Sequence, residues 1–170
     1  MNGDELHGFA RSRALELPGA SAEWPFGPNH EVMKVREKVF LMLTTVPAAS
    51  SGYGVDDTQR GQPVITLKAE PEDGEALQRQ HPSIAPGYHM NKRHWVSVAT
   101  GASIDADLVR ELVTDSYRLV VESMPRHVRP FGWDEPDAVS AARPSGSSMI
   151  DRGPVAGSDS ITARRRIRRS

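Results

Sequence analysis

The stretch PGYHMNKRHW, residues 86–95, is the part of the sequence that says most about the fold and the function of this chain. It brings two histidines, a lysine, an arginine and two aromatic residues close together. Its Pro-Gly pair is typical of a turn. The run from Trp95 to Ala99 that follows has valine at every second position, which is the pattern of a half-buried β-strand. We therefore expect a loop with cationic and aromatic side chains that leads directly into a strand.

Outward from this stretch, the sequence predicts a single α+β domain. Helices are expected over residues 2–17, over residues 70–81 and from residue 105 to about 124, and strands in a hairpin over residues 31–45, over residues 62–69 and over residues 95–99. Asn2 with Glu5 three residues later is the pattern of a capping box, and Pro125 ends the last helix. The order α-β-β-β-α-β-α favours a mostly antiparallel sheet with helices packed on one face.

Two connecting segments are unusual. Residues 20–30 hold Trp24 and Phe26 between prolines, which argues against a regular element. We interpret this segment as a loop that covers one end of the core with aromatic rings; the alternative is an aromatic loop that faces a ligand. Residues 47–63 are rich in serine, glycine and alanine, and loops of this length are usually functional or disordered. We expect a mobile hairpin connection there.

Composition divides the chain into a domain over residues 1–133 and a tail over residues 134–170. The tail holds seven serines, three prolines and three glycines but no aromatic residue, so it cannot bury enough apolar surface to offset the entropy of ordering. We predict that it is disordered. Its C-terminal arginines are Arg164, Arg165, Arg166, Arg168 and Arg169. Of the 21 basic residues, 16 remain without these five, against 22 acidic residues, so an acidic body carries a basic end.

Several classes of function are disfavoured by what the sequence lacks. There is no cysteine, which excludes disulfides, thiolate metal sites and cysteine nucleophiles. No apolar run is long enough to span a bilayer, and the N-terminus lacks the pattern of a signal peptide, so we expect a cytoplasmic protein without a membrane partner. Because no nucleotide-binding glycine motif and no nucleophile elbow occur, we predict no enzymatic activity and no cofactor.

Histidines and one serine are the remaining candidates for a metal site or for catalysis. The spacing of His89 and His94 resembles half of a zinc site, and His81 lies nearby, but no cysteine or close carboxylate completes it. We predict no metal site. Ser116 lies on the apolar stripe of the last helix and Asp115 points about 100° away from it. We expect Ser116 to pack there and to bond back to a carbonyl of its own helix.

Five segments together resemble the MmcQ/YjbR family. They are residues 17–19 with the loop at 23–27, residues 35–40 with Lys38, residues 67–68, the stretch at 86–95, and Asp115-Ser116-Tyr117. The stretch at 86–95 is the specific part. The resemblance implies a compact α+β fold similar to frataxin (CyaY-like), and members of the family are commonly labelled DNA-binding. It implies nothing about residues 47–63, which are long for the family, or about the tail, which has no counterpart.

The resemblance and the strand pattern together favour a DNA-binding surface. If Val96 and Val98 face the helices, then Trp95 faces the other side of the sheet, and the same alternation exposes Thr66 with Lys68. The predicted nucleic-acid-binding residues are Lys34, Lys68, Tyr88, His89, Lys92, Arg93, His94 and Trp95. Cations around aromatic rings suit a phosphate backbone and a stacked base. Because the permanent cations are few and the body is acidic, we expect weak, salt-dependent binding without base specificity.

Two alternatives stay open, and the oligomeric state stays unknown. In the first, the ring of Trp95 belongs to the core and the cations form a solvated rim. In the second, the chain is a small-molecule or protein interaction module. The loop with Trp24 and Phe26 and the loop from Tyr88 to His94 would then line one pocket.

Overall fold

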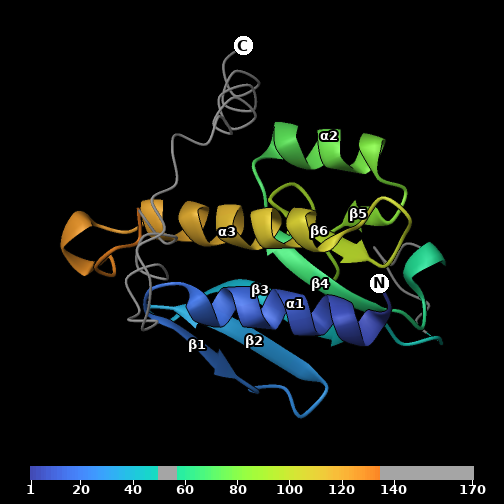
Figure 1. Ribbon diagram of the computed structural model, residues 1–170, viewed down its shortest axis with the longest axis horizontal. Helices are drawn as coiled ribbons and strands as arrows, with labels where there is room; N and C mark the ends of the chain where they lie inside the picture. Colours follow the sequence, from blue (N-terminus) through green and yellow to red (C-terminus); the bar gives the residue numbers. More distant parts are fainter. Residues whose placement is uncertain (50–56, 135–170) are drawn as a thin grey trace, which may run out of the picture.

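The computed structural model describes residues 1–49 and 57–134. The elements are α1 (Gly3–Glu16), β1 (Ala20–Glu23), β2 (His30–Val35), β3 (Lys38–Thr45), the 3₁₀ turn η1 (Asp57–Gln59), β4 (Pro63–Lys68), α2 (Pro71–Gln80), β5 (Ile84–Pro86), β6 (Trp95–Ala99), α3 (Ala106–Glu122) and the 3₁₀ turn η2 (Arg126–Val128) (Figure 1). Residues 50–56 and 135–170 lie outside the described residues. The predictions of a mobile connection, of a disordered tail and of a boundary near residue 133 therefore stay predictions.

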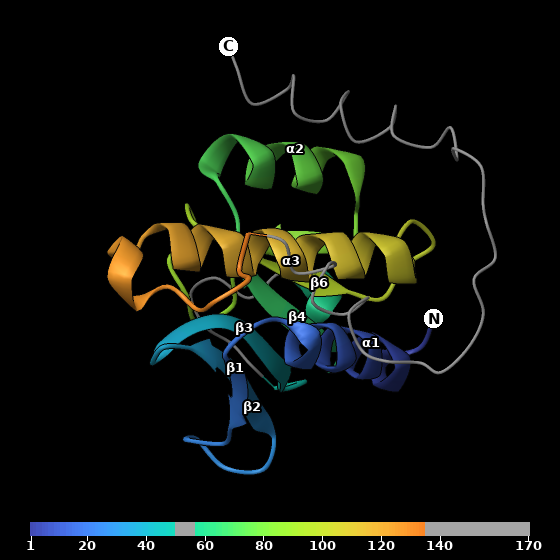
Figure 2. The ribbon, with the colours of Figure 1, turned by 60° about the vertical axis from the view of Figure 1, so that its left-hand side comes forward.

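The strands form one six-stranded sheet in the order β1-β2-β3-β4-β6-β5, and each neighbouring pair is antiparallel. The helices α1 and α3 lie side by side against this sheet and run in the same direction, while α2 lies beyond α3 (Figures 1 and 2). The α+β domain with an antiparallel sheet is therefore as predicted, with two short strands added.

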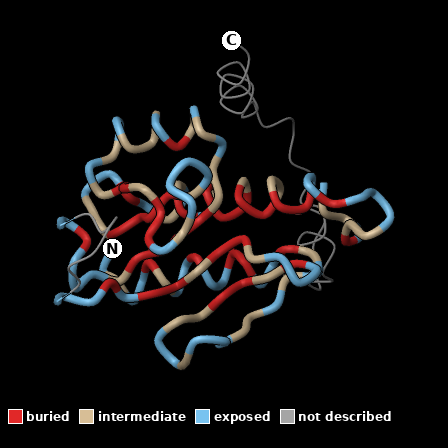
Figure 3. The backbone as a smooth tube through the Cα atoms, turned by 180° about the vertical axis from the view of Figure 1, so that it is seen from behind, coloured by how far each residue is buried: buried red, intermediate tan, exposed pale blue. Residues whose placement is uncertain are grey.

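The main core lies between the helices and the sheet. Alternate strand residues point into it: Met33, Val35, Leu41, Leu43, Ile65, Leu67, Val96 and Val98. The stripe of α3 that meets them includes Val109, Leu112, Val113, Tyr117 and Val120. Seen from behind, these buried stretches run through the central strands and α3, whereas α2 is mostly half-buried or exposed (Figure 3). The apolar alternation in sequence thus decides which face of each strand the helices cover.

The helix ends follow the capping signals in the sequence. The side chain of Asn2 accepts a hydrogen bond from the Glu5 N–H, and the Glu5 carboxylate accepts one from the Asn2 N–H, so the predicted capping box is confirmed. At α3, the Asp105 side chain accepts from the Leu108 N–H at 2.8 Å. The helix ends at Glu122, before Pro125. These contacts satisfy backbone donors that a helix N-terminus leaves unpaired.

Two strands occur where the sequence predicted irregular backbone. Residues 20–23 pair along β2, with Ala20 opposite Val35, although Ala-Ser-Ala-Glu has weak intrinsic preference for a strand. The free edge of β2 supplies the hydrogen bonds that impose it. The strand β5 contains Pro86 and lies at the other edge of the sheet, where a missing N–H is tolerated.

The aromatic loop after β1 is also different from the prediction. Trp24 is 48% exposed and Phe26 is 71% exposed, so these rings do not cover an end of the core. The guanidinium of Arg11 on α1 lies 5.7 Å from the Trp24 ring centroid instead. The loop extends from the edge strand of the sheet, and that position leaves its rings at the surface.

The face of the sheet away from the helices is partly covered. A second apolar cluster of Val46, Val64, Tyr88 and Ala99 lies there. The Gln59 amide donates to the Ser97 carbonyl oxygen at 2.9 Å, and the Tyr88 N–H donates to the Ser97 hydroxyl at 2.8 Å. Thr66, predicted to be exposed, is buried and shares a hydrogen bond with Ser97. The prediction was wrong because η1 and the loop before β6 fold under this face.

Candidate nucleic-acid interface

The cross-strand pair Lys68 and Trp95 lies at one end of β4 and β6. Residues directly opposite in an antiparallel pair share one face of the sheet. The loop before β6 adds Lys92, Arg93 and His94, all exposed. We call these five residues the Lys92 surface. The structure thus brings together five of the eight predicted contact residues.

The ring of Trp95 is neither core nor fully open. Trp95 is half-buried and lines a small cavity of about 60 Å³ with Lys92 and Arg93 on one side and Gly74 and Gln78 of α2 on the other. Ligand pockets are typically roughly 300–1,000 Å³. This cavity is too small to hold a ligand, so the chemistry of the surface is that of its cations and of the exposed part of the indole.

Within the described part of the chain, the permanent cations of the Lys92 surface are not engaged in ion pairs, although Glu75 of α2 lines the same small cavity. Among residues 1–49 and 57–134, Lys68, Lys92 and Arg93 form no ion pair within 4.0 Å. An anion that approaches them therefore does not have to break an ion pair of the described residues. The three cations outnumber the Glu75 carboxylate, so the surface is positively charged.

Lys34 lies apart from this surface. It projects from β2, and β3 and β4 separate that strand from β6. Its ammonium donates a 2.6 Å hydrogen bond to the Glu23 carboxylate of β1, and this bond raises the pKa of Lys34. Because its charge is already paired, Lys34 is a poor candidate for a phosphate contact. Its partner lies on the strand that sequence reasoning missed.

The positions of Tyr88 and His89 also differ from the prediction that both contact nucleic acid. Tyr88 is buried in the second cluster, so its ring has no free face on which a base could stack. His89 is exposed with a left-handed φ of 56°, and its ring centroid lies 4.0 Å from that of Tyr88. Tyr88 thus anchors the loop, and His89 packs over the anchor.

The two aromatic loops do not line one pocket. Trp24 and Phe26 follow β1 at one edge of the sheet, whereas the loop from Tyr88 to His94 joins β5 to β6 at the other edge. Four strands lie between the edge strands β1 and β5, at about 4.8 Å for each strand spacing. The predicted pocket shared by both loops is therefore wrong.

Basic residues near the end of α3 have a structural role that the sequence analysis missed. Arg129 donates from Nε to the Met124 carbonyl oxygen at 3.0 Å and from its amino group to the Glu122 carbonyl oxygen at 2.9 Å. Arg36 donates to the Val128 carbonyl oxygen at 3.1 Å. Cations at a helix C-terminus satisfy its free carbonyls and favour its dipole. These arginines therefore fix the chain after α3.

The described residues offer neither a cluster of metal ligands nor a membrane-spanning helix. Within the part of the chain that the structure describes, no three His, Asp or Glu side chains gather as a metal site would require. None of the helices described is both long enough and apolar enough to cross a bilayer.

The chain is similar in sequence to a known family and to several of its members. A family model described as YjbR matches residues 15–119. The chain is 40% identical over 134 residues to the uncharacterized protein YbdF of Escherichia coli O157:H7, covering 76% of this chain and 99% of that protein. It is 35% identical over 97 residues to the uncharacterized protein YjbR of Escherichia coli K12, covering 57% of this chain and 71% of that one.

Solved structures show the same arrangement. The crystal structure of Deinococcus radiodurans protein DR2400, of the domain family DUF419, matches with a TM-score of 0.58 and 30% identity over 88% of this chain and 96% of that chain. A crystal structure of a Pseudomonas syringae protein matches with a TM-score of 0.53 and 28% identity, covering 70% of this chain and 98% of that chain.

Proposed function

The chain belongs to the YjbR family, and from that premise we propose that it is a non-enzymatic cytoplasmic protein that binds DNA weakly and without base specificity. The observation that supports this proposal is the Lys92 surface. Three permanent cations, Lys68, Lys92 and Arg93, lie there around a half-buried Trp95 and form no ion pair among the described residues. The CyaY-like arrangement that the resemblance implies stays a prediction.

The expected strength of binding follows from the number of cations. Each phosphate neutralised on a duplex releases counterions, and the logarithm of the binding constant falls with the logarithm of salt concentration with a slope of about −0.9 per contact. Three contacts give a slope of about −2.7, so affinity falls roughly 40-fold between about 50 and 200 mM salt. Nothing on this surface reads base edges in a fixed geometry, which is why sequence preference is not expected.

The test is a salt titration of binding to a fluorescent duplex, followed by anisotropy. The full chain is used with its five C-terminal arginines changed to glutamine, so that the signal reports on the body. We expect measurable binding at low salt with the slope above, and a slope about 1.8 shallower after Lys92→Gln with Arg93→Gln. Arg126→Gln is the matched control, because Arg126 of η2 is an exposed cation outside the surface and forms no ion pair among the described residues.

Three outcomes contradict the proposal. They are no binding at low salt, binding that does not depend on salt, and a loss from Arg126→Gln as large as the loss from the Lys92 and Arg93 changes. A duplex of unrelated sequence must bind with the same affinity, because the proposal assigns no base readout.

A further inference from the structure

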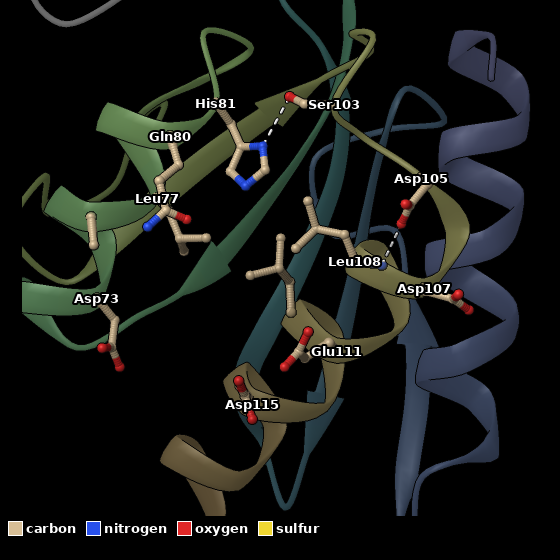
Figure 4. Close-up of a pocket in the computed structure, with 12 residues that line it drawn as sticks. Asp73, Leu77, Gln80, His81, Ser103, Asp105, Asp107, Leu108, Glu111 and Asp115 are labelled. Carbon is tan, nitrogen blue, oxygen red and sulfur yellow. Dashed lines mark hydrogen bonds between the residues drawn. The ribbon is translucent and has the colours of Figure 1, made fainter. Parts of the chain in front are cut away.

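A second surface lies between α2 and α3. It is a groove of about 650 Å³, within the size range of ligand pockets (Figure 4). Leu77 of α2 and Leu108 and Leu112 of α3 form its apolar floor. At one end, Nδ1 of His81 and the Ser103 hydroxyl lie 2.9 Å apart and share a hydrogen bond. The groove is thus a hollow with a hydrophobic base, bounded by two helices.

The rim of this groove is acidic. Its carboxylates are Asp73, Asp105, Asp107, Glu111 and Asp115, and among the described residues no lysine or arginine lines it. Asp105 is held in place because its side chain caps α3 through the Leu108 N–H. Acidic groups around an apolar floor favour a ligand that combines positive charge with one apolar side chain. The groove therefore fits a basic peptide segment that carries a hydrophobic residue.

Such a segment occurs in the chain itself. Residues 164–169 read RRRIRR, so five arginines surround Ile167. Their positive charge is opposite in sign to that of the rim, and the single apolar side chain among them suits the leucine floor. The segment thus matches the groove in the sign of its charge and in its hydrophobic content.

The length of chain allows this contact. The described part ends at Asp134, thirty residues before Arg164. An extended chain spans about 3.3 Å per residue, or roughly 100 Å for this segment. The helix α3, whose N-terminal half borders the groove, has 17 residues and is about 25 Å long. The tail can therefore reach back along α3 with chain to spare.

We propose that residues 164–169 dock in the α2–α3 groove of the same molecule. Ile167 contacts the leucine floor, and the arginines pair with the rim carboxylates. Because the segment is covalently attached, its effective concentration at the groove is in the millimolar range, and individually weak pairs suffice. The proposal does not depend on DNA binding.

The groove and the Lys92 surface lie on different sides of α2. α2 uses Asp73, Leu77 and Gln80 toward the groove, and Gly74 and Gln78 toward the Lys92 surface. Docked arginines are held on the other side of α2 from that surface. They are then withdrawn from any polyanion that the Lys92 surface contacts.

The test uses a spin label on the full chain. Because the protein has no cysteine, Ser170→Cys provides a single attachment site for a nitroxide. We expect the label to broaden the amide NMR signals of Leu77, Leu108 and Leu112 selectively, relative to the reduced label. The broadening should disappear at 1 M salt, where the Debye length is about 3 Å. It should also disappear when the five arginines become glutamine.

Matched variants locate the contact. Asp107→Asn removes an exposed charge from the rim and should weaken the broadening, whereas Asp4→Asn removes an exposed charge from α1 and should leave it unchanged. Broadening spread evenly over the surface, or unaltered in the glutamine variant, overturns the proposal. So does broadening of an isotope-labelled chain by a separate spin-labelled chain, because the occupant is then a second copy. These readouts need no DNA, so they stand apart from the DNA titration.

Discussion

The hydroxyl of Ser116 donates a 2.5 Å hydrogen bond to the carbonyl oxygen of Phe40. The same hydroxyl accepts a 2.8 Å hydrogen bond from the Lys68 N–H. Phe40 is the extra residue of a bulge in β3, because Met33 pairs with Leu41 while the next residue of β2 pairs with residue 39. One buried side chain of α3 thus joins β3 to β4 where the regular ladder has ended. The sequence had suggested a bond back to its own helix, which is wrong.

Ser116→Ala should therefore destabilise the domain. It leaves the partly buried Lys68 N–H and the buried Phe40 carbonyl oxygen without this partner, at a cost of about 1–3 kcal/mol in the free energy of unfolding. Urea denaturation measures the change. Ser123→Ala is the control, because Ser123 is an exposed residue whose hydroxyl donates to the Val120 carbonyl oxygen of its own helix and accepts only a long 3.5 Å bond from Lys38. A loss from Ser116→Ala no larger than that of the control would contradict the bridging role.

The burial of Tyr117 should make the stability of the fold depend on pH in the alkaline range. The side chain is buried, its hydroxyl donates to the Pro18 carbonyl oxygen at 2.5 Å, and burial raises the pKa of Tyr117. The unfolded chain loses this proton near pH 10, whereas the folded protein retains it. The stabilisation is therefore complete below about pH 10 and is lost as pH rises from there toward the raised folded value.

Tyr117→Phe should flatten that dependence. It should also lower stability at neutral pH by about 1 kcal/mol through the lost hydrogen bond. Urea denaturation of both proteins from neutral pH to above pH 10 makes the comparison. Lys34 also has a raised pKa and loses its pairing with Glu23 at alkaline pH, but it does so in both proteins. Parallel stability curves would show that Tyr117 does not titrate differently on unfolding.

Gly87 permits the close crossing of the loop over Trp95. A Cβ at this position would lie 2.6 Å from the Trp95 Cβ and 2.9 Å from its carbonyl oxygen, which are not flexible atoms. Gly87→Ala should therefore cost about 1–3 kcal/mol, as overpacking does. Gly8→Ala is the matched control in an open helical position and should stabilise by about 0.5–1 kcal/mol. Thermal unfolding of both variants measures the two changes in stability. Equal changes for Gly87→Ala and Gly8→Ala would contradict the close crossing at Gly87.

Charge neutralisation separates Lys68 from Lys34. In the DNA titration, Lys68→Gln should make the salt slope shallower by about 0.9, because it removes one phosphate contact. Lys34→Gln removes a lysine that already pairs with Glu23, so the slope should stay unchanged. If Lys34→Gln has the larger effect, the DNA-binding surface lies over β1 and β2 instead.

Much of the fold follows from local patterns. The bounds of β6 are those predicted, because valine alternates along residues 95–99 and a turn follows. The hairpin of β2 and β3 was predicted from two apolar runs around a charged turn, and its two central residues, Arg36 and Glu37, adopt the positive φ that tight hairpins need. In contrast, β1 has no such pattern, because its strand conformation comes from the edge of β2.

The candidate site could be predicted only where sequence neighbours are also spatial neighbours. Lys92, Arg93 and His94 precede Trp95 directly, so they were found together. The pairing of Lys34 with Glu23 depends on β1 and was therefore missed. The burial of Tyr88 depends on Val46, Val64 and Ala99, which lie far from it along the chain. The groove between α2 and α3 likewise needs two helices whose packing no short pattern records.

The position of α3 also determines when the chain can fold during synthesis. This helix packs on β2, β3, β4 and α1, and it is the last helix of the described part to leave the ribosome. Until then, side chains such as Met33, Leu41 and Ile65 have no cover from α3. Domains whose core closes late expose apolar surface that chaperones recognise and that promotes aggregation. In a nascent chain stalled before residue 106, these side chains therefore lack the helix that covers them in the folded domain.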